Sequence, residues 1–282
     1  MFGPLAASRA LRSGGTKRAY DAHMMGHRLA EHQRDWEDLA HLDPLWAIAS
    51  APDRRYGAWD DEEFMATGRR KAASIVRTLE QLGAPATRRR VLDFGCGVGR
   101  VTIPLADHFD EAVGVDIAPA MVDQARARAA GRDDVRFLVD EREDLGLLDG
   151  DRFDLVYTAL VLQHLASREQ VGRCVRALAR LVAPGGVLMA QMPSRLAPWA
   201  HLQPRRRAYA ALRSAGVPRE VLYGRLGLHP MRLLAFPRRA FEALLADEGL
   251  HVAAVSARRR GASLSCTYLA VRPGGDGCSS RS

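Results

Sequence analysis

The chain has 282 residues, of which 47% are hydrophobic and 26% are charged, and this balance is typical of a globular protein that buries a substantial core. No apolar run approaches the roughly 20 residues that cross a bilayer, so we expect no membrane partner. The formal net charge is +8, carried almost entirely by arginine because only Lys17 and Lys71 are lysines. The four cysteines show neither paired nor metal-ligand spacing, which predicts no metal site and favours a reducing, cytoplasmic location.

Two segments precede the first clear strand. Residues 1–20 contain no acidic residue and no long apolar segment of the kind found in a secretory signal, so we expect a disordered leader, with a mitochondrial transit peptide as the alternative. Residues 21–83 predict a helical cover made of two helices. The first helix reaches about His41 and is broken by the Asp-Pro pair at Asp43. The second runs from Asp60 to Leu82 and begins with acidic residues, which suit a helix N-terminus.

A glycine-rich loop follows this cover. Val91–Arg100 reads VLDFGCGVGR, in which a short apolar strand leads into Asp93 and then into Gly95, Gly97 and Gly99. Alternating glycines permit positive φ and let the backbone approach a ligand without a Cβ in the way. Between a strand and a helix, such a loop aims free backbone N–H groups at whatever lies above the sheet edge.

An acidic residue downstream strengthens this interpretation. Residues 112–117 read AVGVDI, a second short strand that ends in Asp116, 17 positions after Gly99. That distance allows for a helix and a turn, and a carboxylate at the tip of the second strand is where a ribose diol finds its acceptor. Asp93 argues against a nicotinamide site and suits a ligand with a cationic amino group near the loop.

The Asp-x-Gly-x-Gly-x-Gly form of this loop resembles the first motif of the class I S-adenosylmethionine (SAM) dependent methyltransferases, in particular those that act on small molecules. The resemblance covers roughly residues 70–272 and implies an α/β fold, a doubly wound sheet of seven strands with the last antiparallel. It places the SAM-binding domain at residues 84–272 and names SAM as the cofactor. The cofactor-binding positions that it implies in the first half of the domain are Asp93, Gly95, Cys96, Gly97, Gly99, Asp116, Ile117 and Met121.

Later strands extend the implied cofactor site. The third strand, Val135–Val139, is followed by two acids, Asp140 and Glu141. In the family one acid here accepts a hydrogen bond from the adenine amino group; we keep both and place Glu141 slightly ahead. The segment after the fourth strand contacts the amino-acid part of SAM in the family, and here that role falls on Thr158, Ala159 and Leu160.

His164 is the candidate catalytic residue. It lies a few residues after the fourth strand, near the reacting methyl group in related enzymes, and a neutral imidazole there could take a proton from a substrate hydroxyl. The alternative is a histidine that holds the loop through hydrogen bonds to the backbone.

Residues 194–237 are too long for a simple connection and predict a lid over the substrate, as in related enzymes. This segment contains the run Arg205–Arg207, which would suit a carboxylate or phosphate on the substrate. The runs Arg88–Arg90 and Arg258–Arg260 have no interleaved aromatic residues, so we interpret them as solvated and expect no nucleic-acid partner. Two final strands complete the sheet, and residues 273–282 predict a disordered tail.

The resemblance therefore implies a methyltransferase that moves a methyl group from SAM to an oxygen or nitrogen, less readily a carbon, of a small molecule such as a biosynthetic or secondary metabolite. Two alternatives stay open. One is a methyltransferase that acts on RNA or protein, which only the positive charge supports. The other is a SAM-binding protein without transferase activity. The sequence does not identify the methyl acceptor or the oligomeric state.

Overall fold

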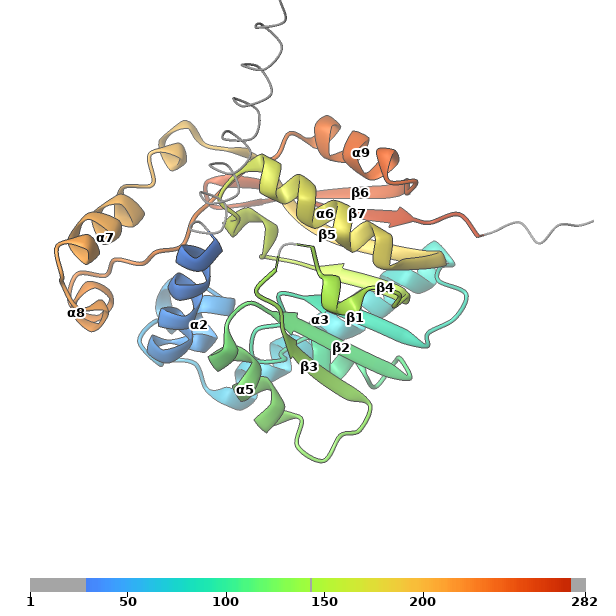
Figure 1. Ribbon diagram of the computed structural model, residues 1–282, viewed down its shortest axis with the longest axis horizontal. Helices are drawn as coiled ribbons and strands as arrows, with labels where there is room; N and C mark the ends of the chain where they lie inside the picture. Colours follow the sequence, from blue (N-terminus) through green and yellow to red (C-terminus); the bar gives the residue numbers. More distant parts are fainter. Residues whose placement is uncertain (1–28, 143, 275–282) are drawn as a thin grey trace, which may run out of the picture.

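The computed structural model describes residues 29–142 and 144–274, so the predicted leader and nearly all of the predicted tail lie outside the described residues. Its centre is a seven-stranded sheet in the order β3-β2-β1-β4-β5-β7-β6 (Figure 1). The strands are β1 (Arg90–Phe94), β2 (Glu111–Asp116), β3 (Val135–Val139), β4 (Phe153–Thr158), β5 (Val182–Leu196), β6 (His251–Arg260) and β7 (Ser263–Val271).

Strand directions confirm the predicted sheet. Strands β1 to β5 pair in parallel, whereas β7 is antiparallel to both of its neighbours, β5 and β6. The chain order reverses on either side of β1, which lies between β2 and β4. In doubly wound sheets the carboxyl ends of the strands at such a reversal form a crevice for a ligand. The fold therefore places its ligand site beside the glycine-rich loop.

Helices cover both faces of the sheet. One face packs against α6 (Arg168–Leu181) and α9 (Arg238–Asp247), and the other against α3 (Asp61–Leu82), α4 (Thr102–Leu105) and α5 (Pro119–Arg128). Helix α6 has local reasons to form, because the Ser167 side chain caps its first turn and Val171, Val175 and Leu178 bury one apolar stripe. No helix within residues 29–142 and 144–274 is long and apolar enough to span a bilayer.

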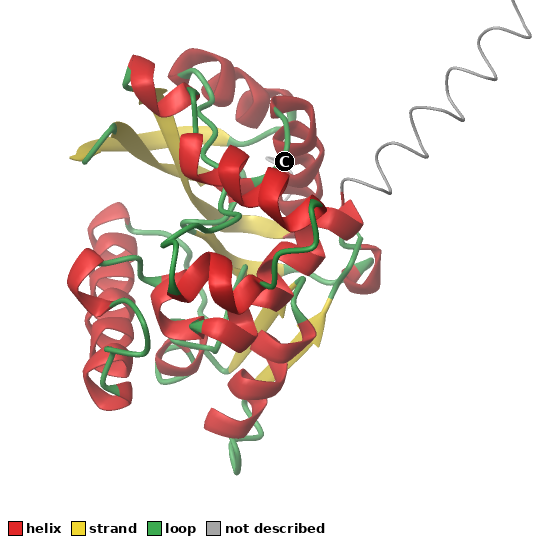
Figure 2. Cartoon of the chain, turned by 90° about the vertical axis from the view of Figure 1, so that its left-hand side faces the viewer, coloured by secondary structure: helices red, strands yellow, loops and turns green. Residues whose placement is uncertain are grey.

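The described part of the N-terminal segment lies over the carboxyl ends of the strands. It consists of a helix over residues 29–42, α2 (Pro44–Ile48) and the short 3-10 turn η1 (Pro52–Arg54). Asp43 ends the first helix and caps the second by accepting a hydrogen bond from the Trp46 backbone N–H at 3.3 Å. Figure 2 looks onto this edge of the molecule, where helices lie in front of the strands.

The predicted insertion, residues 194–237, begins with the last residues of β5, contains three short helical elements and lies beside the N-terminal segment (Figures 1 and 2). Its elements are the 3-10 turn η4 (Pro198–His201), α7 (Pro204–Ser214) and α8 (Arg219–Gly224). Two further 3-10 turns, η2 (Gly146–Leu148) and η3 (Leu162–His164), flank β4.

Several elements differ in length from the sequence prediction, α4 and β5 most clearly. We expected a helix over residues 100–108, but α4 has only four residues, one of them Pro104, which lacks the N–H that would continue the ladder. We expected β5 over residues 187–191, but it continues to Leu196. The reason is pairing with β7, since Leu196 stands opposite Ser263 although the parallel partner β4 has already ended.

Candidate active site

One large cavity, called here the central cavity, lies at the carboxyl ends of β1 to β4. The helix over residues 29–42 and α2 form its opposite wall. Together with the open solvent at its mouth, it spans about 1110 Å³ of space that holds no protein atom. An aspartate stands at the end of each of three adjacent strands: Asp93 in β1, Asp116 at the end of β2 and Asp140 directly after β3.

The glycine-rich loop adopts the predicted left-handed backbone, with φ of +79° at Gly95 and +54° at Gly97. A Cβ on Gly97 would lie 2.5 Å from Cδ1 of Ile48, and one on Gly95 would lie 2.1 Å from Cγ2 of Val161. The glycines therefore allow α2 and the segment after β4 to close onto the loop. Gly95 and Cys96 line the cavity with Gly97, and burial raises the pKa of the Cys96 thiol.

The first amides of this loop are not free, contrary to our expectation. The backbone N–H groups of Gly95 and Cys96 both donate to the carbonyl oxygen of Val115, at 2.8 and 3.1 Å. The N–H of Gly97 donates to Oδ2 of Asp116 at 2.8 Å. The end of β2 satisfies these three donors, so the loop contributes shape more than free amides at these positions.

Asp93 is buried beneath the loop and accepts a hydrogen bond from Oγ1 of Thr102 at 2.6 Å. Burial raises the pKa of this carboxyl to about 6, while the Thr102 hydroxyl and the Arg100 guanidinium act in the opposite direction. Asp93 is therefore mostly ionised at neutral pH, a negative charge at the cavity beside the glycines.

Asp116 joins β2 to the loop and to α5. Besides the Gly97 N–H, it accepts a hydrogen bond from the backbone N–H of Ala118 at 3.0 Å. Burial raises the pKa of its carboxyl, although these hydrogen bonds act to lower it. Ile117 and Met121 line the cavity beside it, where the sequence placed them.

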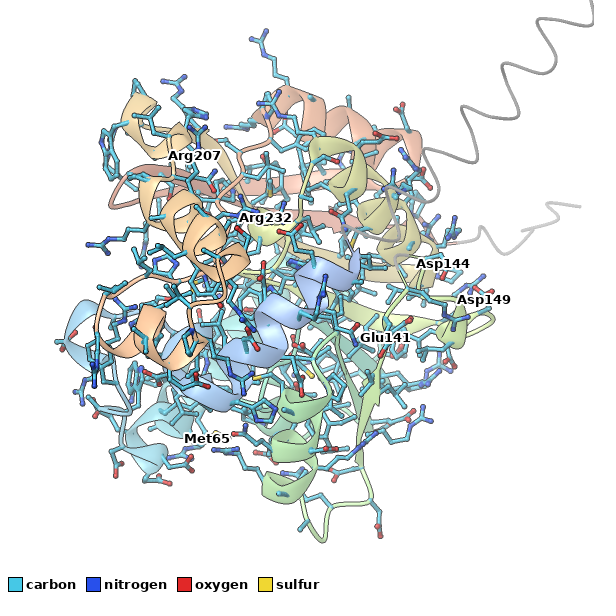
Figure 3. All side chains as sticks on the ribbon, turned by 60° about the vertical axis from the view of Figure 1, so that its left-hand side comes forward. Met65, Glu141, Asp144, Asp149, Arg207 and Arg232 are labelled. Atoms are coloured by element: carbon cyan, nitrogen blue, oxygen red, sulfur yellow. The ribbon has the colours of Figure 1, made fainter. Side chains whose placement is uncertain are left out.

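The structure separates the two acids after β3. Asp140 is 7% exposed and lines the central cavity; its Oδ1 accepts the Arg142 backbone N–H at 2.9 Å, whereas its buried Oδ2 has no hydrogen-bond partner among the described residues. Glu141 is exposed, does not line the cavity, and accepts a hydrogen bond from Nε2 of Gln33 at 2.7 Å (Figure 3). Our preference for Glu141 is corrected in favour of Asp140.

Of the remaining predicted cofactor positions, some line the central cavity and others do not. Ala159 and Leu160 line the central cavity, and Leu160 holds φ at +64°, a conformation that costs free energy in a residue with a side chain. Thr158 and Gly99 do not line it. Thr158 is buried within β4, and Gly99 accommodates the ring of Phe137, because a Cβ at residue 99 would lie 2.8 Å from Cζ of that ring.

His164 does not face the central cavity, so the structure does not support it as a base. Its Nδ1 lies 2.6 Å from the backbone carbonyl oxygen of Arg232 and its Nε2 lies 3.1 Å from Nε2 of Gln163. Trp36 packs edge-on against the ring, with centroids 5.2 Å apart. Burial lowers the pKa of His164 to about 4. The alternative interpretation fits: the imidazole ties the loop after β4 to the insertion.

The sequence analysis missed His32 as a site residue. Leu29, His32 and Trp36 line the central cavity from one face of the helix over residues 29–42. Their helical spacing is the sequence feature that could have identified them. His32 is 6% exposed and makes no side-chain hydrogen bond within residues 29–142 and 144–274. Burial lowers its pKa to about 3, so the imidazole is neutral at pH 7. Of the described residues that form the cavity wall opposite the strands, His32 is the titratable one.

Two arginines of the insertion, Arg206 and Arg232, contact the N-terminal helix and do not line the cavity. Nη2 of Arg232 lies 2.9 Å from Oε1 of Glu31, and Nη2 of Arg206 lies 3.5 Å from the same oxygen; Figure 3 shows Arg232 at the centre of this region. Nearby, burial raises the pKa of Asp35 to about 7. Arg206 therefore holds the insertion to the helix, and a substrate anion at this run of arginines stays a prediction.

Comparison with known proteins shows which class of enzyme this chain resembles. Residues 91–186 match the family model described as a methyltransferase domain. A trans-aconitate 2-methyltransferase from Methylobacterium nodulans is 36% identical over 153 residues, which cover 52% of this chain and 55% of the relative. A ubiquinone biosynthesis O-methyltransferase from Azorhizobium caulinodans is 36% identical over 108 residues, covering 37% of this chain and 40% of the relative. The chain thus spans about half the length of the curated relatives it matches.

Solved structures show the same fold. Magnesium protoporphyrin IX methyltransferase from Synechocystis, solved with bound SAH, aligns with a TM-score of 0.56 at 23% identity, over 85% of this chain and 97% of that one. The N-methyltransferase NodS from Bradyrhizobium japonicum aligns with a TM-score of 0.56 at 16% identity, over 86% and 98%. The sheet and its crevice define the Rossmann-like fold of the class I SAM-dependent methyltransferases. Residues 91–186 match the methyltransferase-domain family model and lie within residues 84–272, for which the resemblance predicted a SAM-binding domain.

Proposed function

We propose that this protein binds SAM in the central cavity and transfers its methyl group to an oxygen or nitrogen of a small molecule. The observation that carries the proposal is the row of three carboxylates, Asp93, Asp116 and Asp140, at the ends of adjacent strands around a left-handed glycine loop. These groups match the amino group, the ribose hydroxyls and the adenine amine of one extended ligand.

The residues present fit that cofactor. Oδ2 of Asp140 is buried without a partner among the described residues, and it is an acceptor suited to the adenine amino group. Asp116 is held by the Gly97 and Ala118 N–H groups, which leaves its remaining lone pairs for a ribose diol. Asp93 supplies a negative charge for an ammonium group. When bound, SAM supplies a methyl group activated by a positively charged sulfur.

The protein's own part in such a transfer is to position the acceptor and exclude water. The glycine loop and Leu160 form one side of the cavity, and Leu29, His32 and Trp36 form the other. We propose that residues 21–83 act as the cover and residues 194–237 as the lid of a SAM-binding domain spanning residues 84–272. Support comes from the ion pairs of Glu31 with Arg206 and Arg232, which join the two segments.

An oxygen nucleophile is favoured. The relatives with about 36% identity are named trans-aconitate 2-methyltransferase and O-methyltransferase, whereas a nitrogen acceptor is suggested only by NodS at 16% identity. A small acceptor also fits a cavity with a neutral imidazole and an indole on its wall. We further propose a cytoplasmic location, because the cysteines within the described residues are unpaired.

The test is a methyl-transfer assay with SAM labelled in its methyl group. The acceptor panel contains tricarboxylates including trans-aconitate, phenols and catechols, and primary amines. Label in an O- or N-methylated product supports the proposal. Tight SAH binding with no transfer to any acceptor would favour the non-catalytic SAM-binding alternative, and transfer only to RNA or protein would favour the other.

A further inference from the structure

Two arginine runs that the proposed activity does not use lie at one end of the molecule. Arg258 and Arg259 lie near the end of β6, and Arg205–Arg207 begin α7. Between them runs η4, which is tied to the β6–β7 turn because the Ala197 backbone N–H donates to the carbonyl oxygen of Ala262 at 2.7 Å. Arg195 joins this group, since Arg195 and Arg259 both stand opposite Leu264 in β7.

The exposed arginines here form no ion pair with any described residue. This holds for Arg195, Arg205, Arg207, Arg258 and Arg259, whereas many arginines elsewhere, such as Arg132, are paired with carboxylates. The sequence explains the difference, because residues 170–219 and 249–274 contain no Asp or Glu. The positive charge at this end is therefore not neutralised within the described chain.

Two large apolar side chains project from the same place. Trp199 is 66% exposed and Leu202 is 59% exposed. They lie three residues apart at the 3-10 turn η4, and side chains at this spacing point to the same side of such a turn. The sequence shows no aromatic residue within the arginine runs; the fold places one between them. Figure 3 shows Arg207 at this end, on the outer side of the insertion.

This end also projects beyond the edge that holds the central cavity. Strand β4 pairs with β5 up to Ala190, and β5 continues to Leu196 with only β7 beside it. Six residues of strand extend roughly 20 Å. The turn η4 and the start of α7 thus lie past the carboxyl ends of the parallel strands, on the side of the sheet where the cavity lies (Figure 1).

We propose that this basic–apolar end (Arg195, Trp199, Leu202, Arg205, Arg207, Arg258 and Arg259) docks peripherally on a bilayer surface that contains anionic lipid. Arginines attract the phosphates of anionic headgroups, and tryptophan and leucine side chains insert at the headgroup–acyl boundary. The exposed aliphatic chain of Leu202 favours lipid over nucleic acid, whose backbone offers it no apolar contact. The expectation of no membrane partner rested on the lack of a spanning segment, which does not bear on peripheral docking.

Vesicle sedimentation tests this directly and needs neither cofactor nor acceptor. The full chain is mixed with vesicles of phosphatidylcholine alone or with about a third phosphatidylglycerol. We expect binding to the anionic vesicles that falls at high salt. The double variant Trp199→Ala/Leu202→Ala should lower the partition coefficient about tenfold, and each of Arg205→Ala, Arg207→Ala and Arg259→Ala about fivefold.

The matched control is Leu147→Ala with Arg126→Ala, an exposed leucine and an exposed arginine elsewhere on the surface, which should leave partitioning unchanged. The proposal is overturned by wild-type protein that does not sediment with anionic vesicles, or by a control pair as damaging as the Trp199 and Leu202 pair. Salt-sensitive binding to single-stranded RNA without vesicle binding would also overturn it. So would a stable dimer that the Trp199→Ala/Leu202→Ala variant dissociates.

Discussion

Tyr223 of α8 donates its hydroxyl hydrogen to Oδ2 of Asp43 across 2.5 Å, so the insertion and the N-terminal segment share one buried carboxylate. The same oxygen accepts the backbone N–H groups of Tyr56 at 2.7 Å and Gly57 at 3.2 Å. The Arg55 guanidinium lies over the Tyr223 ring, 4.5 Å from its centroid. Asp43 therefore organises the wall of the central cavity opposite the strands.

Asp43→Ala should lower the free energy of unfolding by about 2–4 kcal/mol, because it leaves several donors without their charged acceptor. Tyr223→Phe removes one of these bonds and should cost about 1.5–3 kcal/mol. Urea unfolding of both variants beside wild type measures the difference. If neither substitution changes the unfolding midpoint, Asp43 does not hold the two segments together.

Gly68 lets α3 cross the chain after the glycine loop. A Cβ at this position would lie 1.8 Å from the backbone carbonyl oxygen of Arg100. Gly68→Ala should therefore destabilise the protein by about 1–3 kcal/mol, even though alanine is the better helix former. Gly172→Ala in α6 is the control, since the nearest atom is 3.6 Å away on the flexible Arg176 side chain. It should raise the melting temperature; parallel losses in both variants would contradict the account.

His164 should make the protein sensitive to acid. Burial lowers its pKa to about 4, so the unfolded chain binds a proton there at a higher pH than the folded chain does. Its contribution is intact above the ordinary pKa of about 6.5 and is lost as the pH falls toward 4, by about 1.4 kcal/mol for each pH unit.

His164→Asn can still donate to the Arg232 carbonyl but does not titrate. The difference in free energy of unfolding, wild type minus variant, should therefore shrink as the pH falls from 7 to 5. Comparing the two proteins cancels the other titrating groups, such as Asp93, whose raised pKa acts in the opposite direction. A difference that stays constant with pH would show that His164 is not held neutral by burial.

His32 should affect the acceptor and not the cofactor. Once an acceptor is found, His32→Ala should lower kcat/KM about tenfold, the scale of one lost hydrogen bond, while SAH affinity stays within about twofold. The control is His41→Asn on the same helix, whose side chain is 54% exposed and outside the cavity. An equal loss of SAH affinity in His32→Ala would instead place this imidazole against the cofactor.

Local sequence predicted the parts of the site that depend on local geometry. Glycines with positive φ and an aspartate at a strand end are determined by the strand–loop–helix unit that contains them. For this reason the loop motif, its spacing and the family resemblance it carries pointed to Gly95, Gly97, Asp93 and Asp116, and each lines the central cavity.

Site residues were misplaced in the sequence analysis where contacts with distant segments of the chain determine the position of a side chain. Glu141 follows Asp140 directly in sequence, and the two are distinguished by Gln33, 108 positions away, which binds Glu141 on the outside. His164 was assigned from its place after β4, but its partner is the carbonyl of Arg232, 68 positions later. His32 belongs to a helix whose burial face is decided by the sheet beneath it. Spacing along the chain carries no information about the partners of Glu141 and His164, and for His32 it indicates a shared helix face but not what that face covers.

The most direct measurement is calorimetric titration with SAH of wild type, Asp116→Ala and Glu141→Gln. The account predicts micromolar binding to wild type, binding weakened by about 1–3 kcal/mol in Asp116→Ala, and wild-type affinity in Glu141→Gln, whose side chain lies outside the central cavity. No binding of SAH to the wild-type protein, or equal affinity in wild type and Asp116→Ala, would contradict the claim that this cavity is a SAM site.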